Sequence, residues 1–366
     1  FHEVTKRAIT EAIRTMRDID TKLVEAQIVR RVEDRWIGFE LSKKLWERFG
    51  SRALSAGRVQ TPVLGWVVKR TEEARKRKTL LRAILENEVE VVFENPQNQE
   101  EIIEKAKRGE LKARVTDLVE EVREVPPPPP YTTDSLLRDA FAYLRFSVGL
   151  TMQLAQELFE SGLITYHRTD ATTVSSVGLN IAREYIESSK LGKFIPRTYR
   201  REGAHECIRP VRALDRRRLS QYIQVGLIKP PVKLTDRHLR LYDLIFRRFV
   251  ASQMPAARVR IQRYSVILEG NKAEIERNVE IIRSGFNSVF AVVSAAKRVE
   301  EGEYLVKDVV VRKVPAAWLY TEGEIISLMR ERGIGRPSTY SKIVQVLFNR
   351  GYIFERGGRL IPTKRG

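Results

Sequence analysis

The first fifty residues place their apolar side chains at the spacing of an α-helix. One helical stripe consists of Val4, Ala8, Ile9, Ala12, Ile13 and Met16. The same period continues in EAQIVRRVEDRWIGFELSKKLW, residues 25–46, which also carries three arginines. A Gly and a Pro interrupt it in LSAGRVQTP, before another helix-like run. This pattern predicts a helical segment that ends near residue 75.

The period then changes to that of β-strands. Alternating β-branched and polar residues predict strands in NEVEVVFENP, ARVTDLVEEV, ARVRIQRYSVILEG, SVFAVVSAA and VKDVVVRKVP. The first two precede a run of five prolines, residues 126–130, and the other three lie after residue 256. Five consecutive prolines favour a stiff connector between domains. We expect the two sets to share one sheet, with residues 130–250 inserted between them.

The inserted residues again have a helical pattern. Helices are predicted in TTDSLLRDAFAYL, TMQLAQELFES, VGLNIAREYIES and LYDLIFRRFV. Gly162 follows the second of these and is a natural residue to end it. From residue 321 onward the pattern indicates helix, glycine-rich turn, helix and a hairpin turned at Gly357 and Gly358. That order is typical of a helix-turn-helix with a wing, a common nucleic-acid scaffold.

Charge adds the first functional indication. The 366 residues carry a formal net charge of +19, which favours a polyanionic partner, most simply nucleic acid. The single cysteine, Cys207, excludes an internal disulfide and a multi-cysteine zinc site, and is typical of an intracellular protein. No apolar run is long enough to span a membrane. Because the chain begins at Phe1 without a signal-peptide pattern, we expect it to be part of a longer protein. Abundant charges with scarce Cys and Met suit a thermophile.

The stretch GLITYHRTD, residues 162–170, combines four chemically active side chains directly after a helix end. In an extended segment, residues two apart share a face, so Tyr166, Arg168 and Asp170 point one way and His167 the other. A cation beside a phenol stabilises both a phenolate and the transition state of attack on a phosphodiester. The stretch is therefore a candidate nucleophile site. The alternative is a half-buried tyrosine with charged neighbours.

A second cluster, EGAHECIRP, brings His205, Glu206 and Arg209 together beside a glycine. A histidine among small residues, followed by Arg-Pro, is typical of a loop site. A satisfied structural histidine is the alternative interpretation of this position.

Taken together, the ordered segments resemble a type IA DNA topoisomerase. The matching pieces are FHEVT, EAQIVRRVEDRWIGF, LSAGRVQTP, PPPPYTTDSLL, GLITYHRTD, GAHECIRP and GIGRPSTY with the LFNRGYI and LIPT that follow. Within that family, EDRWIGF, RVQTPVLGW and TYHRTD look most like the topoisomerase half of reverse gyrase. Three positions depart from the usual family form, namely Ala171, Cys207 and Val211.

The resemblance implies a multidomain α+β fold with a toroidal body, in which helical domains, one of them winged-helix-like, are joined by a strand-rich arch. Residues 1–75 and 316–366 would form the DNA-binding helical domain, and residues 76–130 and 248–315 the arch. Residues 131–247 would form the helical domain that carries the tyrosine.

The resemblance also implies roles. Tyr166 would be the nucleophile that forms a 5′-phosphotyrosine, with Arg168 and His205 as catalytic partners. The residues expected to contact DNA are Arg31, Arg35, Arg58, Gln60, Asp170, Arg209, Arg336, Ser338 and Thr339. Small hydroxyls and backbone donors in the GRPST turn suit phosphate contacts.

No metal ligands are expected within this chain. The family's Mg²⁺ site would lie in an acidic domain that precedes FHEVT, and ATP would act only through the helicase-like half of reverse gyrase. The expected partner is DNA, chiefly single-stranded, bound by a cytoplasmic monomer that acts on the chromosome. Alternatives are a single-strand clamp without chemistry and, more weakly, a tyrosine recombinase, whose arginine–histidine–arginine set is not found before a C-terminal tyrosine.

Overall fold

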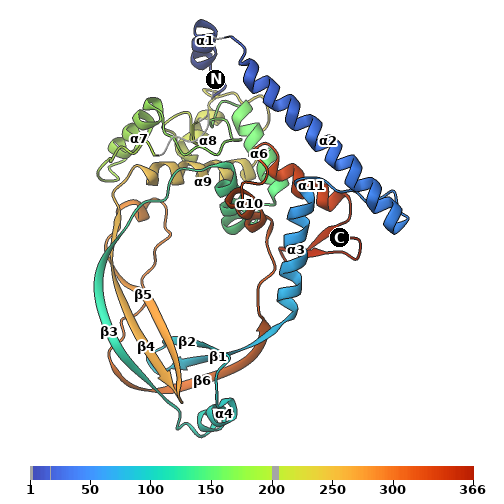
Figure 1. Ribbon diagram of the computed structural model, residues 1–366. Helices are drawn as coiled ribbons and strands as arrows, with labels where there is room; N and C mark the ends of the chain where they lie inside the picture. The colour runs from blue at the N-terminus through green and yellow to red at the C-terminus, as the bar shows by residue number, and fades with distance from the viewer. Residues whose placement is uncertain (1–2, 17, 200–205) are drawn as a thin grey trace.

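The computed structural model describes residues 3–16, 18–199 and 206–366, and its chain traces a ring (Figure 1). A helical block occupies one side of the ring and a curved sheet the opposite side, while helix α3 (Gln60–Arg75) connects the two. This is the toroidal α+β architecture that the resemblance implies. Among the described residues, no helix combines the length and the apolar character that crossing a membrane requires.

The first two helices lie outside the ring. They are α1 (Lys6–Arg14), which begins at the capping hydroxyl of Thr5, and α2 (Thr21–Phe49), which ends at left-handed Gly50. The predicted helical pattern is confirmed, but the apolar stripe does not enter a core, since Ile13 and Met16 are 61% and 79% exposed. Helix α2 buries only Ser42. Periodicity therefore identified the helices correctly without showing what covers them.

The arch is one antiparallel sheet of six strands in the order β2-β1-β6-β3-β4-β5. Its strands are β1 (Arg77–Leu85), β2 (Glu90–Glu94), β3 (Lys112–Val125), β4 (Ala257–Leu268), β5 (Asn271–Arg283) and β6 (Gly302–Pro315). The expectation that strands before and after the insertion share one sheet is confirmed. Helix α4 (Gln99–Arg108), which was not predicted, packs on this sheet through Ile102.

Strand pairing also explains how the insertion is accommodated. Val125 at the end of β3 pairs with Ala257 at the start of β4, so the chain leaves the sheet and returns to it at neighbouring positions. At the other leg, Arg77 of β1 pairs with Pro315 of β6, which brings α3 and the C-terminal segment together.

Three strand assignments need correction, and the first is that strand β1 (Arg77–Leu85) was not predicted. Residues 288–296 are not a strand; a short 3-10 turn, η2 (Gly285–Ser288), precedes an irregular stretch. The apolar character there serves another purpose, because Phe286 and Phe290 insert into the core of the helical block. Strand β5 was missed, although its alternation of charged and apolar residues carries the signal of a strand with one face covered.

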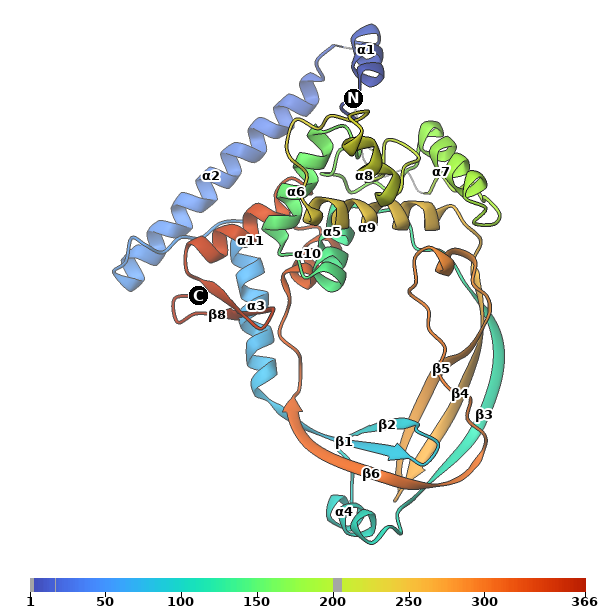
Figure 2. The same cartoon turned by 180° about the vertical axis from the view of Figure 1, so that it is seen from behind.

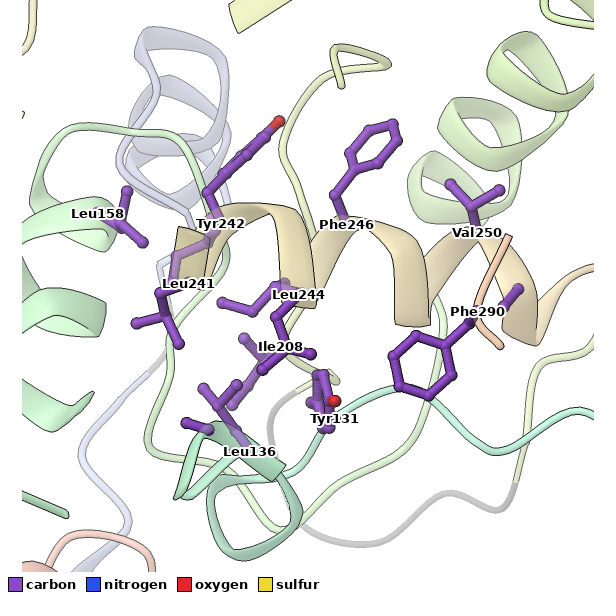
Figure 3. Packing of buried hydrophobic residues seen from close by; sticks show 14 of the residues in the cluster. Tyr131, Leu136, Leu158, Ile208, Leu241, Tyr242, Leu244, Phe246, Val250 and Phe290 are labelled. Atoms are coloured by element: carbon purple, nitrogen blue, oxygen red, sulfur yellow. The ribbon is translucent and has the colours of Figure 1, made fainter. Parts of the chain in front are cut away.

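The inserted block contains α5 (Thr133–Asp139), a π-helical turn η1 (Ala140–Leu144), α6 (Val148–Glu160), α7 (Ser176–Ser188), α8 (Arg216–Gln224) and α9 (Asp236–Ser252). Figure 3 shows α9 running through its core, where Leu241, Tyr242 and Phe246 project among neighbouring segments. The predicted boundary at residue 247 falls inside α9, which continues to Ser252 before β4 begins.

The C-terminal segment is the predicted helix-turn-helix with a wing. It consists of α10 (Glu322–Glu331), α11 (Tyr340–Asn349) and the hairpin of β7 (Ile353–Arg356) and β8 (Arg359–Pro362). Val63 and Val67 of α3 share its core, so residues 60–75 and 316–366 form one unit although 240 residues separate them. Residues 60–75 of the predicted first segment thus join the C-terminal segment, whereas Glu3 and Val4 at the chain start pack on the inserted block.

Candidate active site and nucleic-acid groove

Three segments that are distant in sequence meet around the tyrosine stretch. Ile164 forms an isolated antiparallel bridge with Pro210, and Tyr131 forms another with Ile208. The N–H of Thr165 donates to the carbonyl of Arg209 at 2.9 Å. These bonds join the chain that enters the block, the tyrosine stretch and the GAHECIRP motif, so the structure brings together the motifs that the sequence singled out.

The tyrosine stretch alternates in burial as an extended segment does. Tyr166, Arg168 and Asp170 are half-buried, whereas His167 and Thr169 are 1% exposed. The buried side is held by Thr133, whose hydroxyl donates to the carbonyl of His167 at 2.8 Å and accepts from the N–H of Thr169 at 2.9 Å. Tyr166, Arg168 and Asp170 are thus the partly accessible residues of the stretch, but the backbone bends at residues 167 and 168, so the stretch is not the regular extended segment that was predicted.

Helix α6 and the turn after it position the tyrosine ring. Phe159 of α6 meets the Tyr166 ring edge-on, with centroids 5.3 Å apart, and the guanidinium of Arg168 donates to Gln156 of the same helix at 3.1 Å. Gly162 ends the helix in the left-handed region, as predicted, and a Cβ there would lie 2.6 Å from the carbonyl oxygen of Val4. The start of the chain thus packs against the turn that leads into Tyr166.

His167 lies on the buried side of the stretch. Within the described part of the chain, neither ring nitrogen makes a hydrogen bond. Burial, reinforced by the nearby Arg168 charge, lowers the pKa of His167 to about 4. The imidazole is therefore neutral near pH 7. The prediction that His167 points away from Tyr166 is wrong, because the two rings meet edge-on with centroids 5.7 Å apart.

Arg209 occupies a different position from the one expected of a DNA contact. Its side chain is 1% exposed and donates to both carboxylate oxygens of Glu206, at 2.9 and 2.7 Å. The Glu3 carboxylate lies 3.6 Å away on the same guanidinium. In this structure Arg209 ties the chain start to the GAHECIRP motif and offers no surface to DNA. His205, the other candidate in that motif, lies outside the described residues.

The expected DNA contacts line a groove between α2 and the GRPST turn. A hollow of about 1150 Å³ is lined by Arg31 and Arg35 of α2 and by Arg336, Ser338 and Thr339 of the turn. Arg336 is exposed, and its N–H and carbonyl are both bonded to the hydroxyl of Thr339, which fixes the turn. Residues that were predicted separately therefore share one basic surface.

A second hollow of about 360 Å³ adjoins the first through Arg30 and Thr339 and is lined by Arg58 and Gln60. Arg58 is held by Glu33 at 3.1 Å and Asp34 at 2.7 Å. The groove also includes three basic residues that were not singled out, namely Arg30, Lys342 and Arg350. Arg30 belongs to the arginine cluster of α2. Lys342 lies on α11 and Arg350 directly follows it, and only the tertiary fold shows that they line the same hollow as α2.

Asp170 lies within electrostatic range of Tyr340, the first residue of α11. Burial, together with the nearby Asp134 and Asp170 carboxylates, raises the pKa of Tyr340 to about 12. Tyr340 directly follows the GRPST turn, so Asp170 lies near the base of that turn.

The described residues do not fit a magnesium site. Among them, no group of three or more His, Cys, Asp or Glu side chains could hold a metal ion. Glu206 of the GAHECIRP motif is engaged by Arg209. No metal-dependent step is assigned to this chain.

Comparisons with known proteins agree with the fold. A family model described as DNA topoisomerase matches residues 18–366. Reverse gyrase of Pyrococcus furiosus is 48% identical over 373 residues, and that of Pyrobaculum aerophilum 46% over 372 residues; each match covers 100% of this chain and 30% of the relative. The structure of full-length topoisomerase I from Thermotoga maritima superposes with a TM-score of 0.78 at 30% identity, over 99% of this chain and 63% of that one.

This chain therefore spans 30% of the length of the reverse gyrases it matches. The family match covers nearly all of it, and the shared ring and sequence identity extend from end to end. On these grounds the chain belongs to the type IA DNA topoisomerase family and is a module homologous to part of reverse gyrase.

Proposed function

We propose that this chain cleaves and reseals one DNA strand through Tyr166, as part of a reverse-gyrase-like enzyme. One observation carries the proposal: Tyr166, Arg168 and Asp170 remain partly accessible on a segment whose intervening residues, His167 and Thr169, are buried and anchored by Thr133 through hydrogen bonds to their backbone. Such a segment holds a nucleophile and its neighbouring cation in a fixed relation, and fixed geometry lowers the barrier to attack.

The proposed chemistry is a transesterification. The Tyr166 oxygen, as its proton departs, bonds to the phosphorus of a DNA phosphodiester while the bond from phosphorus to O3′ breaks. The products are a 5′-phosphotyrosine and a 3′ hydroxyl, which takes up a proton, and the reverse reaction reseals the strand. Arg168 would stabilise the charge that develops on the phosphate oxygens. His205 is proposed as a further catalytic partner.

The groove supplies the binding part of this proposal. Arginines from α2 and the GRPST turn line it, and the chain carries +19 overall, so a single strand would be held mainly through its phosphates. Mg²⁺ and ATP would act through parts of the enzyme other than this chain. We propose a monomer that works with the chromosome in the cytoplasm.

Covalent trapping tests the nucleophile. The full-length protein is mixed with single-stranded oligonucleotides, denatured, and digested, and any DNA-linked peptide is mapped by mass spectrometry. We expect an adduct on Tyr166 that disappears in Tyr166→Phe, because phenylalanine lacks the attacking oxygen. Tyr222→Phe, a change at a tyrosine that is 39% exposed on α8, is the matched control and should leave the adduct intact.

The competing function is a single-strand clamp without chemistry. The groove favours it, because its basic lining residues do not include Tyr166. Tight binding of single strands with no adduct at Tyr166, in the full-length protein supplied with Mg²⁺, would establish the clamp and overturn the cleavage proposal.

A further inference from the structure

Where the inserted block meets the C-terminal segment, the ring is closed by through-space packing. Both chain connections of the inserted block, residues 126–130 and 253–256, lead to the leg of the arch where β3 pairs with β4. On its other side the block touches the C-terminal segment only through space, where α5 meets α10 and α6 meets α11. We call this contact between α5–α6 and α10–α11 the seam.

Much of the seam is apolar. Leu137 of α5 and Val148 of α6 are buried in one cluster with Ile325, Ile326 and Met329 of α10. Apolar burial is strong but has little directional preference, so it does not by itself fix how α6 is oriented against α10.

A buried carboxylate supplies the direction. Glu322, the first residue of α10, is 6% exposed, and its Oε2 accepts from the N–H of Val148 at 2.9 Å. Val148 is the first residue of α6, so this N–H has no partner within its own helix. The carboxylate therefore caps a helix in the other segment while lying at the start of its own, and two helix N-termini favour its negative charge.

The surroundings make this bond conditional on a closed seam. Burial raises the pKa of Glu322, and Glu355 on β7, the titratable group facing it, raises it further; the Val148 N–H acts in the opposite direction. A carboxylate buried beside another acid is costly unless its hydrogen bond is made. Arg330, which pairs with Asp134 across the same seam at 3.1 Å, is 36% exposed, so water screens that contact more strongly.

We propose that Glu322 is a positioning residue that caps α6 across the seam and so fixes the helix leading into Tyr166 whenever the ring is closed. The consequence for cleavage rests on the proposed function above. The hydrogen bond between Glu322 and Val148 does not depend on that function. Helix α6 runs from the capped Val148 to the turn at Gly162 whether or not Tyr166 cleaves DNA.

Hydrogen exchange of the Val148 amide measures the contact directly. In full-length protein, Glu322→Ala should raise the exchange rate of that amide at least about tenfold, because a hydrogen bond to a charged group is removed. Glu322→Gln keeps an acceptor oxygen and should stay within about threefold of wild type. Glu322→Asp has a side chain shorter by one methylene, so it should raise the exchange rate of the Val148 amide as the alanine variant does. It replaces Glu322→Ala in this test if the alanine variant does not fold.

Glu324→Ala is the matched control. Glu324 lies two residues further along α10, but its carboxylate accepts from Thr321 within its own capping box and pairs with Arg359. This variant should leave exchange at Val148 unchanged. Unchanged exchange in Glu322→Ala, or equal acceleration in both alanine variants, would overturn the proposal.

Covalent trapping then tests the link to cleavage. We expect Glu322→Ala to slow adduct formation at Tyr166 at least about fivefold with unchanged affinity for single strands, and Glu322→Gln to restore it. Loss of DNA binding together with cleavage would contradict a positioning role. If wild type forms no adduct while Val148 exchange still depends on Glu322, the cleavage proposal fails and the cap stands.

Discussion

The buried guanidinium of Arg209 pairs with the carboxylates of Glu206 and Glu3. The side chain of Arg168, on the tyrosine stretch, remains partly accessible. Both are arginines in motifs that the sequence marked as functional. Burial separates their roles, because a guanidinium enclosed by Glu206 and Glu3 neutralises charge within the fold. One in a half-open position can still approach a phosphate.

We therefore expect Arg209→Ala to destabilise the protein strongly. Removing one partner of a buried ion pair leaves the other charge uncompensated and costs about 3–5 kcal/mol. Arg216→Ala, on an arginine that is 41% exposed and paired with Asp236, should cost at most about 1 kcal/mol. Denaturant unfolding of the two variants measures the difference in their free energies of unfolding. Similar decreases in both would show that the ion pairs of Arg209 contribute no more to stability than an exposed pair does.

Acid stability should depend on His167. Its folded-state pKa of about 4 lies below the ordinary value of 6.5, so the unfolded chain binds more protons between these values. Stability is lost as pH falls from 6.5 toward 4, by up to about 2 kcal/mol at pH 5. In His167→Met this part of the loss should vanish. Unfolding free energies at pH 7 and pH 5 test it, and an identical pH dependence in both proteins would refute the assignment.

At the scale of elements, helix contacts show how closely the seam is packed. A Cβ on Gly323 of α10 would lie 2.9 Å from the Cα of Arg138 in α5, which is backbone and cannot rotate away. Gly149 of α6 faces the same seam, but a Cβ there would meet only the flexible end of Gln345, at 3.8 Å. The close approach of α5 and α10 therefore requires a glycine at position 323, whereas the packing of α6 does not require one at position 149.

Gly323→Ala is expected to destabilise the protein by about 1–2 kcal/mol, since overpacking costs more than the gain in helix propensity. Gly149→Ala should be neutral or stabilising by up to about 1 kcal/mol, because only the propensity changes. Thermal unfolding of both variants tests the pair. A stabilised Gly323→Ala would show that α5 and α10 are packed less tightly than described.

At the scale of the whole molecule, basic residues from opposite ends of the chain line one groove. Single-strand binding should fall steeply with salt, because phosphate neutralisation releases counterions. Replacing Arg31 and Arg35 by alanine should weaken binding and make the logarithmic salt slope shallower by about 0.7 for each phosphate that is no longer neutralised.

The control for this experiment is Arg108→Ala. Arg108 is 61% exposed on α4, at the far side of the arch from the groove. Its removal should leave affinity and salt slope unchanged. Equal effects of the two changes would mean that total charge, rather than the groove, governs binding.

The sequence by itself determined the local elements and the identity of the candidate chemistry. Helical and strand periods, the proline run and the glycine ends are local signals, and the predicted winged segment and the turn at Gly162 follow them. The alternation of burial along Tyr166, His167 and Arg168 is equally local, but the bend at residues 167 and 168, which sets the His167 ring beside that of Tyr166, was not predicted.

Only the tertiary structure decided which charged and apolar groups are covered. It buried Arg209, left the α1 stripe exposed, used Phe286 and Phe290 for the helical core instead of a strand, and set Glu322 on the start of α6. Each of these depends on partners that lie far away along the chain. Burial and pairing of this kind arise from long-range packing, which no local period encodes.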